Sequence, residues 1–184
     1  YEASELFPTP ETDVHPQSFY AVSKLASNVF ADSYARFRGL KTTGLRYFNV
    51  YGPRQDYRRT IPPVMSAFII EMLRGGRPVV YGAGDKKRDF VYVDDVNDFH
   101  IRCIRDPRTD GQVFNIGSGR CYSVLEIFEM VREMLGSDAV ALYKEELPGE
   151  AYQTLADISR ARELGWEPKT DITNGLKRMI EYIK

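Results

Sequence analysis

The sequence predicts an α/β fold built around a parallel sheet. Amphipathic helical stretches alternate with short apolar strands along the chain, an order typical of parallel sheets that are covered by helices. Glycine and proline residues separate these stretches. The chain has 184 residues, of which 43% are hydrophobic, so it is long enough to bury a substantial core.

The first third of the chain contains a loop, a long helix and a strand. Residues 1–16 lack periodicity and contain three prolines, which indicates a loop. Residues 17–38 carry an apolar stripe at helical spacing, and Gly39 is well placed to end that helix. Residues 42–48 then predict a short strand, and we expect residues 49–53 to end it in a turn.

The middle of the chain predicts two more helices and two short strands. Pro62 begins a helix that continues to about residue 74, where two glycines stop it. Strands are expected at residues 79–81 and 90–93. Asp94 or Asp95 is expected to cap the next helix, which runs to about residue 105.

The last third predicts two strands and three helices. Residues 112–116 indicate a strand that is followed by a glycine-containing loop, in which Cys121 is expected to lie. Ser123 and Glu126 have the spacing of a capping box for a helix that ends near residue 135. The remaining expected elements are a strand at 139–143 and helices at 157–164 and 172–183.

Composition excludes several classes of protein. The formal net charge is −1, whereas a surface that coats nucleic acid needs a basic excess, so no nucleic-acid partner is expected. No apolar run reaches about 18 residues, so no membrane span is expected. No secretory signal is visible, and the two cysteines, Cys103 and Cys121, make neither a disulfide framework nor a zinc site. A cytoplasmic protein without a metal is the expectation.

Tyr20 and Lys24 are the most informative pair for chemistry. They lie four residues apart in the first predicted helix, so both side chains project from one face. A fixed positive charge near a phenol favours the phenolate, which can then act as a base. The pair is suited to moving a proton on or off a sugar or alcohol hydroxyl while a hydride moves elsewhere. The alternative is an ordinary surface pair on an amphipathic helix.

A glycine-rich loop that binds phosphate is absent from this sequence. Doubly wound nucleotide-binding sheets begin with a strand, a G-x-G-x-x-G turn and a helix. The nearest runs, Gly82-x-Gly84 and Gly117-x-Gly119, do not open a helix after a third glycine. We therefore expect the chain to be the C-terminal portion of a longer protein.

Four runs in order reveal a family resemblance. They are Tyr20-Ala-Val-Ser-Lys24, residues 45–55 (LRYFNVYGPRQ), residues 81–95 (YGAGDKKRDFVYVDD) and residues 114–119 (FNIGSG). With these runs the chain resembles the extended short-chain dehydrogenase/reductase family of NAD-dependent sugar-nucleotide epimerases and dehydratases. Leu45-Arg-Tyr-Phe-Asn49 is most similar to UDP-glucose and UDP-N-acetylglucosamine 4-epimerases.

The resemblance implies a two-part architecture. The fold would be the C-terminal part of a Rossmann-like doubly wound parallel sheet plus a smaller α/β substrate-binding domain. Residues 1–52 would end the NAD-binding domain. Residues 53–184 would mainly bind the sugar nucleotide, and a segment at about 90–117 would return to the Rossmann core.

The resemblance also implies roles for individual residues toward NAD and the sugar. Tyr20 would be the acid/base at the sugar 4-hydroxyl. Lys24 would hydrogen-bond the nicotinamide ribose and assist Tyr20, and Tyr47 would lie beside the nicotinamide.

The remaining implied roles concern the UDP-sugar substrate. Asn49 would contact the diphosphate or sugar, and Arg88 would bind the diphosphate. Backbone around Val79 and Tyr81 would face the uracil, and Glu150 would contact the nucleotide ribose. Relatives commonly have an arginine where this chain has Leu147, so sugar-nucleotide binding could be altered. The Lys86-Lys87 pair is interpreted as solvated.

The function that follows is a sugar-nucleotide 4-epimerase of the UDP-glucose/UDP-galactose type, which works by transient oxidation at C4 with NAD. Alternatives are a 4,6-dehydratase, a decarboxylase, a reductase, or a non-catalytic nucleotide-binding module of the same fold. The intact protein would be a homodimer. We expect residues 1–184 alone to be inactive.

Overall fold

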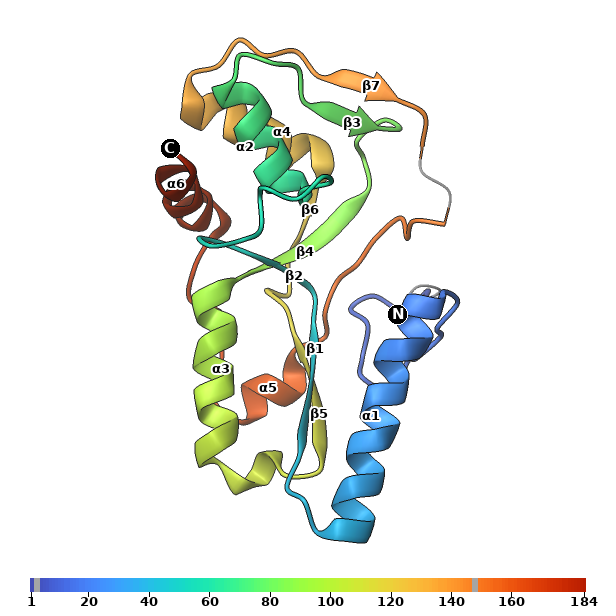
Figure 1. The fold of residues 1–184 in the computed structure, drawn as a ribbon. Helices are drawn as coiled ribbons and strands as arrows, with labels where there is room; N and C mark the ends of the chain where they lie inside the picture. Colours follow the sequence, from blue (N-terminus) through green and yellow to red (C-terminus); the bar gives the residue numbers. More distant parts are fainter. Residues whose placement is uncertain (2–3, 147–148) are drawn as a thin grey trace.

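The computed structural model describes residues 1, 4–146 and 149–184, and it has an elongated shape with two parts. In the lower part of Figure 1, strands β1 and β5 lie between helix α1 on one side and helices α3 and α5 on the other. In the upper part, helices α2, α4 and α6 gather beside strands β3 and β7. Strands β2 and β4 cross the junction between the two parts.

The strands form three small, mainly parallel sheets, which confirms the predicted α/β class. The parallel pairs are β1 (Thr43–Tyr47) with β5 (Gln112–Ile116), β2 (Asn49–Tyr51) with β4 (Lys87–Tyr92), and β3 (Val79–Tyr81) with β7 (Leu142–Lys144). One pair, β4 with β6 (Cys121–Ser123), is antiparallel. Each parallel pair joins segments far apart in the sequence, as parallel strands require.

The helices agree closely with the sequence prediction. They are α1 (Phe19–Arg38), α2 (Val64–Leu73), α3 (Val93–Arg105), α4 (Val124–Leu135), α5 (Ser159–Glu163) and α6 (Ile172–Ile183), with a short 3₁₀ turn at Pro107–Thr109. Gly39 ends α1 in the left-handed region at φ 65°. The predicted capping box of Ser123 and Glu126 is present at α4. Among the described residues, no helix is both long and apolar enough to cross a membrane.

Each of the two parts has its own cluster of buried side chains. The upper cluster is centred on Phe68, Ile127 and Leu176, which come from α2, α4 and α6. The lower cluster is centred on Phe99, Phe114 and Trp166. The indole of Trp166 also donates to the backbone carbonyl of Asp95, so the segment after α5 is fixed to α3. Whether these clusters correspond to the predicted domains stays a prediction.

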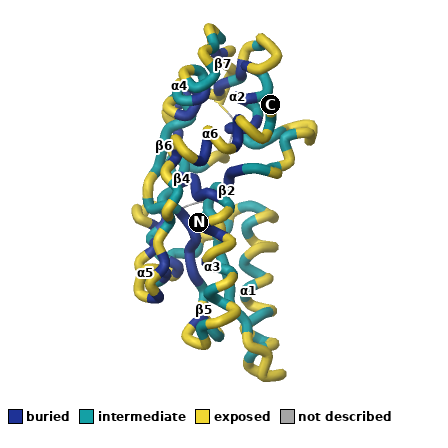
Figure 2. The backbone as a smooth tube through the Cα atoms, turned by 90° about the vertical axis from the view of Figure 1, so that its left-hand side faces the viewer, coloured by how far each residue is buried: buried dark blue, intermediate teal, exposed yellow. Residues whose placement is uncertain are grey.

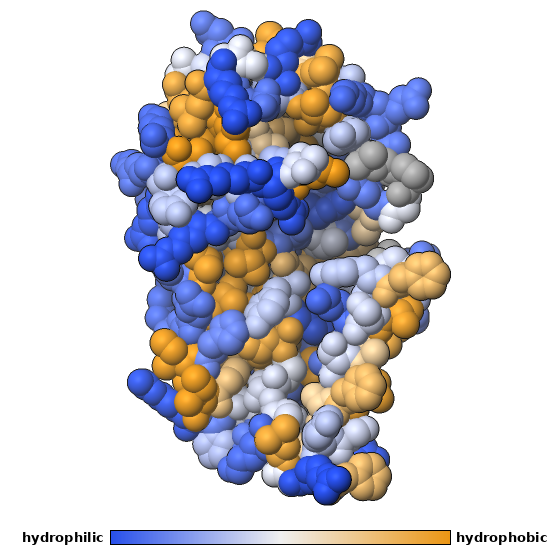
Figure 3. Space-filling view, in the orientation of Figure 1, coloured by the Kyte–Doolittle hydropathy of each residue, from blue (hydrophilic) through white to orange (hydrophobic). Residues whose placement is uncertain are grey.

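Helix α1 is the most exposed helix of the described chain. None of its residues is buried, and Phe19 and Phe37 are 97% and 79% exposed. Figure 2 shows α1 in teal and yellow, without the dark blue of the core strands. Figure 3 shows several apolar side chains along its surface.

Several predicted boundaries are wrong, because long-range pairing overrode local preference. Residues 49–51 form β2 instead of ending a strand in a turn, because they pair with β4. Cys121 lies in β6 and not in a loop, because its segment pairs with the start of β4. The strand expected at 139–143 is the later β7, and β4 starts three residues before the expected Phe90.

The predicted aspartate cap of α3 is also wrong. The N-cap position is Tyr92, and no side chain caps that helix. Asp95 is instead buried and accepts hydrogen bonds from the backbone N–H groups of Lys169 and Thr170, at 3.1 and 3.0 Å. Its carboxylate therefore joins α3 to the chain before α6.

Candidate functional site

A cavity of about 990 Å³ lies in the upper part of the molecule, beside the junction. Its wall brings together residues from the loop before α2, from α2 itself, and from β3 and β4. In Figure 3 hydrophilic side chains form a band across this level of the molecule. A cavity of this size accommodates a ligand as large as a nucleotide conjugate.

The structure brings all five predicted substrate-binding residues to this one cavity. They come from four separate segments of the chain: Asn49 on β2, Val79 and Tyr81 on β3, Arg88 on β4, and Glu150 beyond β7. The pairing of β2 with β4 places Asn49 opposite Phe90, two residues after Arg88. Their common location is an observation, whereas their roles stay predictions.

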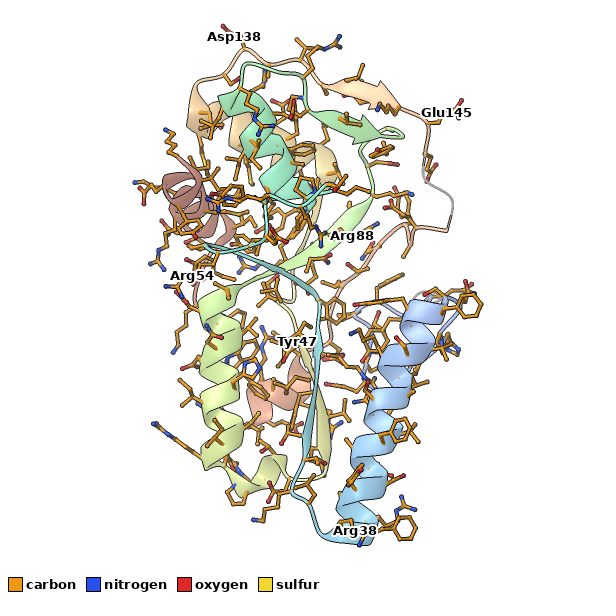
Figure 4. All side chains as sticks on the ribbon, viewed as in Figure 1. Arg38, Tyr47, Arg54, Arg88, Asp138 and Glu145 are labelled. Carbon is orange, nitrogen blue, oxygen red and sulfur yellow. The ribbon has the colours of Figure 1, made fainter. Side chains whose placement is uncertain are left out.

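Arg88 is the best-placed group for an anionic ligand. Its side chain is 17% exposed, and its Nη2 lies 3.6 Å from the Glu150 carboxylate. Its Nη1 donates to the backbone carbonyls of Lys87 and Tyr152. Burial lowers the pKa of Arg88 and the charge of Glu150 opposes this change, but a guanidinium stays protonated at neutral pH. Figure 4 shows Arg88 on β4 at the junction.

The side chain of Asn49 is held in place by its neighbours. Its Nδ2 donates to the backbone carbonyl of Asp89 at 3.0 Å and to the hydroxyl of Thr154 at 3.4 Å. Because these bonds reach β4 and the chain after Glu150, Asn49 connects three segments of the cavity wall.

Lys86 is a residue of the cavity that sequence reasoning missed. The interpretation of Lys86 as solvated is wrong, because its side chain is only 8% exposed. Its ammonium lies 2.8 Å from Glu146 and 3.2 Å from Glu150. The hydrogen bond with Glu146, followed by the one with Glu150, raises the pKa of Lys86 although burial acts against it. The available signal was its i, i+2 spacing from Arg88, which places both side chains on one face of an extended strand.

The cavity as a whole carries an excess of positive charge. Its lining includes five basic side chains and two acidic ones: Arg58, Arg59, Arg74, Lys86 and Arg88, against Glu71 and Glu150. Apolar side chains such as Val79 and Phe90 complete the wall. A positive, partly apolar cavity favours ligands that combine phosphate groups with a flat ring.

Tyr20 and Lys24 lie on the same face of α1, as predicted. The Lys24 ammonium is 5.2 Å from the centre of the Tyr20 ring, and the Tyr20 side chain is 70% exposed. Figure 1 shows the first turns of α1 at the level of the junction. An exposed phenol and ammonium on one face are free to meet a ligand that covers this side of the molecule.

Tyr47 lies on the other side of β1 from α1. Its hydroxyl is 2.8 Å from Nε2 of His100 on α3, and Nδ1 of that ring is 2.9 Å from the Val96 carbonyl. Because the carbonyl accepts from Nδ1, the Tyr47 hydroxyl donates to Nε2. Arg46, the preceding residue, instead reaches Asn28 on α1. The structure therefore does not bring Tyr47 against the Tyr20–Lys24 pair, and its role toward NAD stays a prediction.

One part of the prediction lies outside the described residues. Leu147, which stands where relatives commonly have an arginine, belongs to the stretch of 147–148 that the structure does not describe. Its effect on the cavity stays a prediction.

Comparisons with known proteins identify the family and agree with the fold. The sequence profile of the NAD dependent epimerase/dehydratase family matches residues 2–117. The crystal structure of a UDP-glucose 4-epimerase from Thermotoga maritima with UDP-glucose superposes with a TM-score of 0.94 at 40% sequence identity, over 100% of this chain and 59% of that one.

Two further relatives extend the comparison. A UDP-glucose 4-epimerase of Thermus thermophilus in complex with NAD has a TM-score of 0.84 at 29% identity, over 91% of this chain and 54% of that one. A curated UDP-glucose 4-epimerase of Mycolicibacterium smegmatis is 32% identical over 186 residues, which cover 100% of this chain and 59% of the relative. The chain thus spans a little more than half the length of these relatives.

Proposed function

This chain belongs to the NAD dependent epimerase/dehydratase family, and on that premise we propose that it is part of a sugar-nucleotide 4-epimerase of the UDP-glucose/UDP-galactose type. The observation that carries the proposal is the cavity, in which all five residues expected to bind a UDP-sugar meet in a positive, partly apolar wall. The similarity to the Thermotoga maritima enzyme, whose structure holds UDP-glucose, supports this choice of substrate.

The cavity wall offers a matching group for each part of a UDP-sugar. The guanidinium of Arg88 presents paired donors that suit phosphate oxygens. The strand around Val79 and Tyr81 offers backbone groups to the uracil, and the Glu150 carboxylate can accept from ribose hydroxyls. We propose that Asn49, which lines the same cavity, contacts the diphosphate or the sugar.

The residues on α1 fit the NAD that the family requires. The ammonium of Lys24 can donate to ribose hydroxyls, and the neighbouring phenol of Tyr20 is accessible from the same side. We propose that these two residues hold the nicotinamide end of the cofactor; Tyr47 would join them only if its hydroxyl left His100. When it is bound, NAD supplies the site that accepts the hydride from sugar C4 and returns it.

The protein's own contribution is to move a proton and to orient the sugar. Tyr20 acts as the base that takes the proton of the 4-hydroxyl, and the Lys24 ammonium lies beside it, 5.2 Å from the centre of its ring. After the sugar turns in the cavity, Tyr20 returns a proton to the 4-oxygen. Epimerisation thus needs one acid/base residue that serves both directions of proton transfer.

Domain division, assembly and location follow as proposals from the family resemblance. Residues 1–52 and the segment at about 90–117 belong to the NAD-binding domain, and most of residues 53–184 belong to the substrate domain. The intact protein is a homodimer in the cytoplasm. Its partner molecule is the UDP-sugar, with no nucleic acid and no membrane.

The test is Tyr20→Phe in the intact protein, which leaves the ring and removes the acidic hydroxyl. Interconversion of UDP-glucose and UDP-galactose, followed by chromatography, should slow by about 10²–10⁴-fold, the usual contribution of an acid/base residue. Affinity for UDP should stay within about twofold of the unchanged protein, because the cavity is untouched.

Tyr34→Phe is the matched control, because Tyr34 is an exposed tyrosine farther along the same helix. It should leave turnover unchanged. Near-normal turnover of the Tyr20 variant would refute the assignment, and accumulation of a 4-keto product by the unchanged protein would indicate a dehydratase. Assay of residues 1–184 alone tests the expectation that they have no turnover.

A further inference from the structure

The ammonium of Lys86 lies beside the guanidinium of Arg88 in the cavity wall. One carboxylate oxygen of Glu150, Oε2, is 3.2 Å from Lys86 Nζ and 3.6 Å from Arg88 Nη2. Two cations therefore converge on a single anionic oxygen. All three residues line the same cavity.

The surroundings of Lys86 differ from those of an ordinary surface lysine. Its side chain is 8% exposed, whereas its second partner, Glu146, is 63% exposed. Removing an ammonium from water costs free energy that an ion pair only partly returns. A solvated position would satisfy the same charge without this cost, so the enclosed position at the cavity calls for a reason beyond pairing with two acidic residues.

We propose that Lys86 binds the diphosphate of the sugar nucleotide together with Arg88, and that Glu150 occupies the position of a phosphate oxygen in the nucleotide-free protein. The inference rests on the proposed function. A lysine supplies a compact charge and an arginine supplies a planar fork, so the two contact different phosphate oxygens. Repulsion between carboxylate and phosphate displaces Glu150, which is then free to reach the ribose.

The competing explanation is that Lys86 only neutralises Glu146 and Glu150. The test is binding of UDP and of uridine to Lys86→Gln by titration calorimetry on the intact protein. Loss of one charge-assisted contact should weaken the binding of UDP by about 10- to 100-fold. Uridine has no phosphate, so its affinity should stay within about twofold, and an unchanged melting temperature verifies folding.

Lys87→Gln is the matched control. Lys87 is the adjacent residue with the same charge, but it is exposed and belongs to the other face of the strand. Its loss should leave both affinities unchanged. Equal UDP affinities of the Lys86 and Lys87 variants would overturn the inference while leaving the proposed function intact.

A double variant, Lys86→Gln with Glu150→Gln, separates direct from indirect action. If Lys86 contacts the diphosphate, UDP binding stays at least tenfold weaker than with Glu150→Gln alone. If Lys86 only neutralises Glu150, the double variant regains the affinity of Glu150→Gln, and the inference is wrong. Failure of the unchanged protein to bind UDP would overturn the proposed function, and this inference with it.

Discussion

The buried carboxylate of Asp89 gives the sharpest prediction about stability. Asp89 is 0% exposed, and its Oδ1 accepts from the backbone N–H and the hydroxyl of Ser118, at 2.6 and 2.7 Å. Its Oδ2 accepts from the N–H groups of Gly119 and Ala156, at 3.1 and 3.0 Å. One side chain thereby connects β4 to the loop after β5 and to the segment that leads to α5.

The perturbation is Asp89→Asn, which keeps the shape but replaces one oxygen by an NH₂ group. The amide is best placed with its NH₂ group at the Oδ1 position, where the Ser118 hydroxyl can accept from it and donate to the Arg120 carbonyl, but the backbone N–H of Ser118 then faces another donor. One hydrogen bond to a charged acceptor is lost, at about 1.5–3 kcal/mol, and the bonds from Gly119 and Ala156 weaken by about 1 kcal/mol each because their acceptor becomes neutral. Part of this is offset because burial disfavours the charged carboxylate and raises the pKa of Asp89. The expected net loss is about 2–4 kcal/mol.

Urea unfolding followed by fluorescence measures this loss. Trp166 is the only tryptophan of the sequence and is buried against Phe99, so its emission reports on the lower cluster. Asp85→Asn, at an exposed aspartate of the preceding turn, is the control and should change the free energy of unfolding by less than about 0.5 kcal/mol. A loss below about 0.5 kcal/mol for Asp89→Asn would refute the hydrogen-bond reasoning.

Three further predictions concern the helices of the upper part. Gly175→Ala in α6 should destabilise the fold by about 1–3 kcal/mol in urea unfolding, although alanine has the better helix propensity. The reason is that the added Cβ would lie 2.7 Å from ring carbons of the buried Tyr51. Lys177→Ala is the exposed control, and a gain in stability at position 175 would contradict the packing argument. Ser123→Ala should cost about 1 kcal/mol through loss of the α4 cap. The backbone N–H of Ser123 lowers the pKa of Glu126 below its ordinary value of 4.5, so this carboxylate stabilises the fold above pH 4.5 and ceases to do so as pH falls through the lowered pKa. Denaturant unfolding of Glu126→Gln and of the unchanged protein at pH 7 and at pH 3 should therefore show a difference in the free energy of unfolding that is smaller at pH 3. A larger difference at pH 3 would contradict this prediction.

The helices were predictable because their signals are local. Ser123 with Glu126 and the left-handed Gly39 set helix ends through neighbours three or four residues away. The candidate substrate residues could also be named in advance, because the four runs that carry the family resemblance contain or flank most of them. Tyr20 and Lys24 could be placed on one face from their spacing alone.

The missed features all depend on partners far along the chain. Residues 49–51 form a strand because they pair with β4. Asp95, which was expected to cap α3, instead accepts a hydrogen bond from backbone about 75 residues away. The burial of Lys86 depends on acidic residues 60 or more positions later. In the sequence, Lys86-Lys87 looks like any pair of exposed lysines. Only the folded structure shows that the Lys86 side chain is shielded from water.

The sequence by itself thus determined the α/β class, most of the helix ends and the family, because these depend on short-range pattern and on the order of motifs. Only the tertiary structure decided that five residues from four segments share one cavity, that Tyr47 turns toward α3, and that Lys86 lies beside Arg88. The physical reason is that burial and strand pairing are properties of contacts between distant segments, and those contacts form only when the whole chain folds.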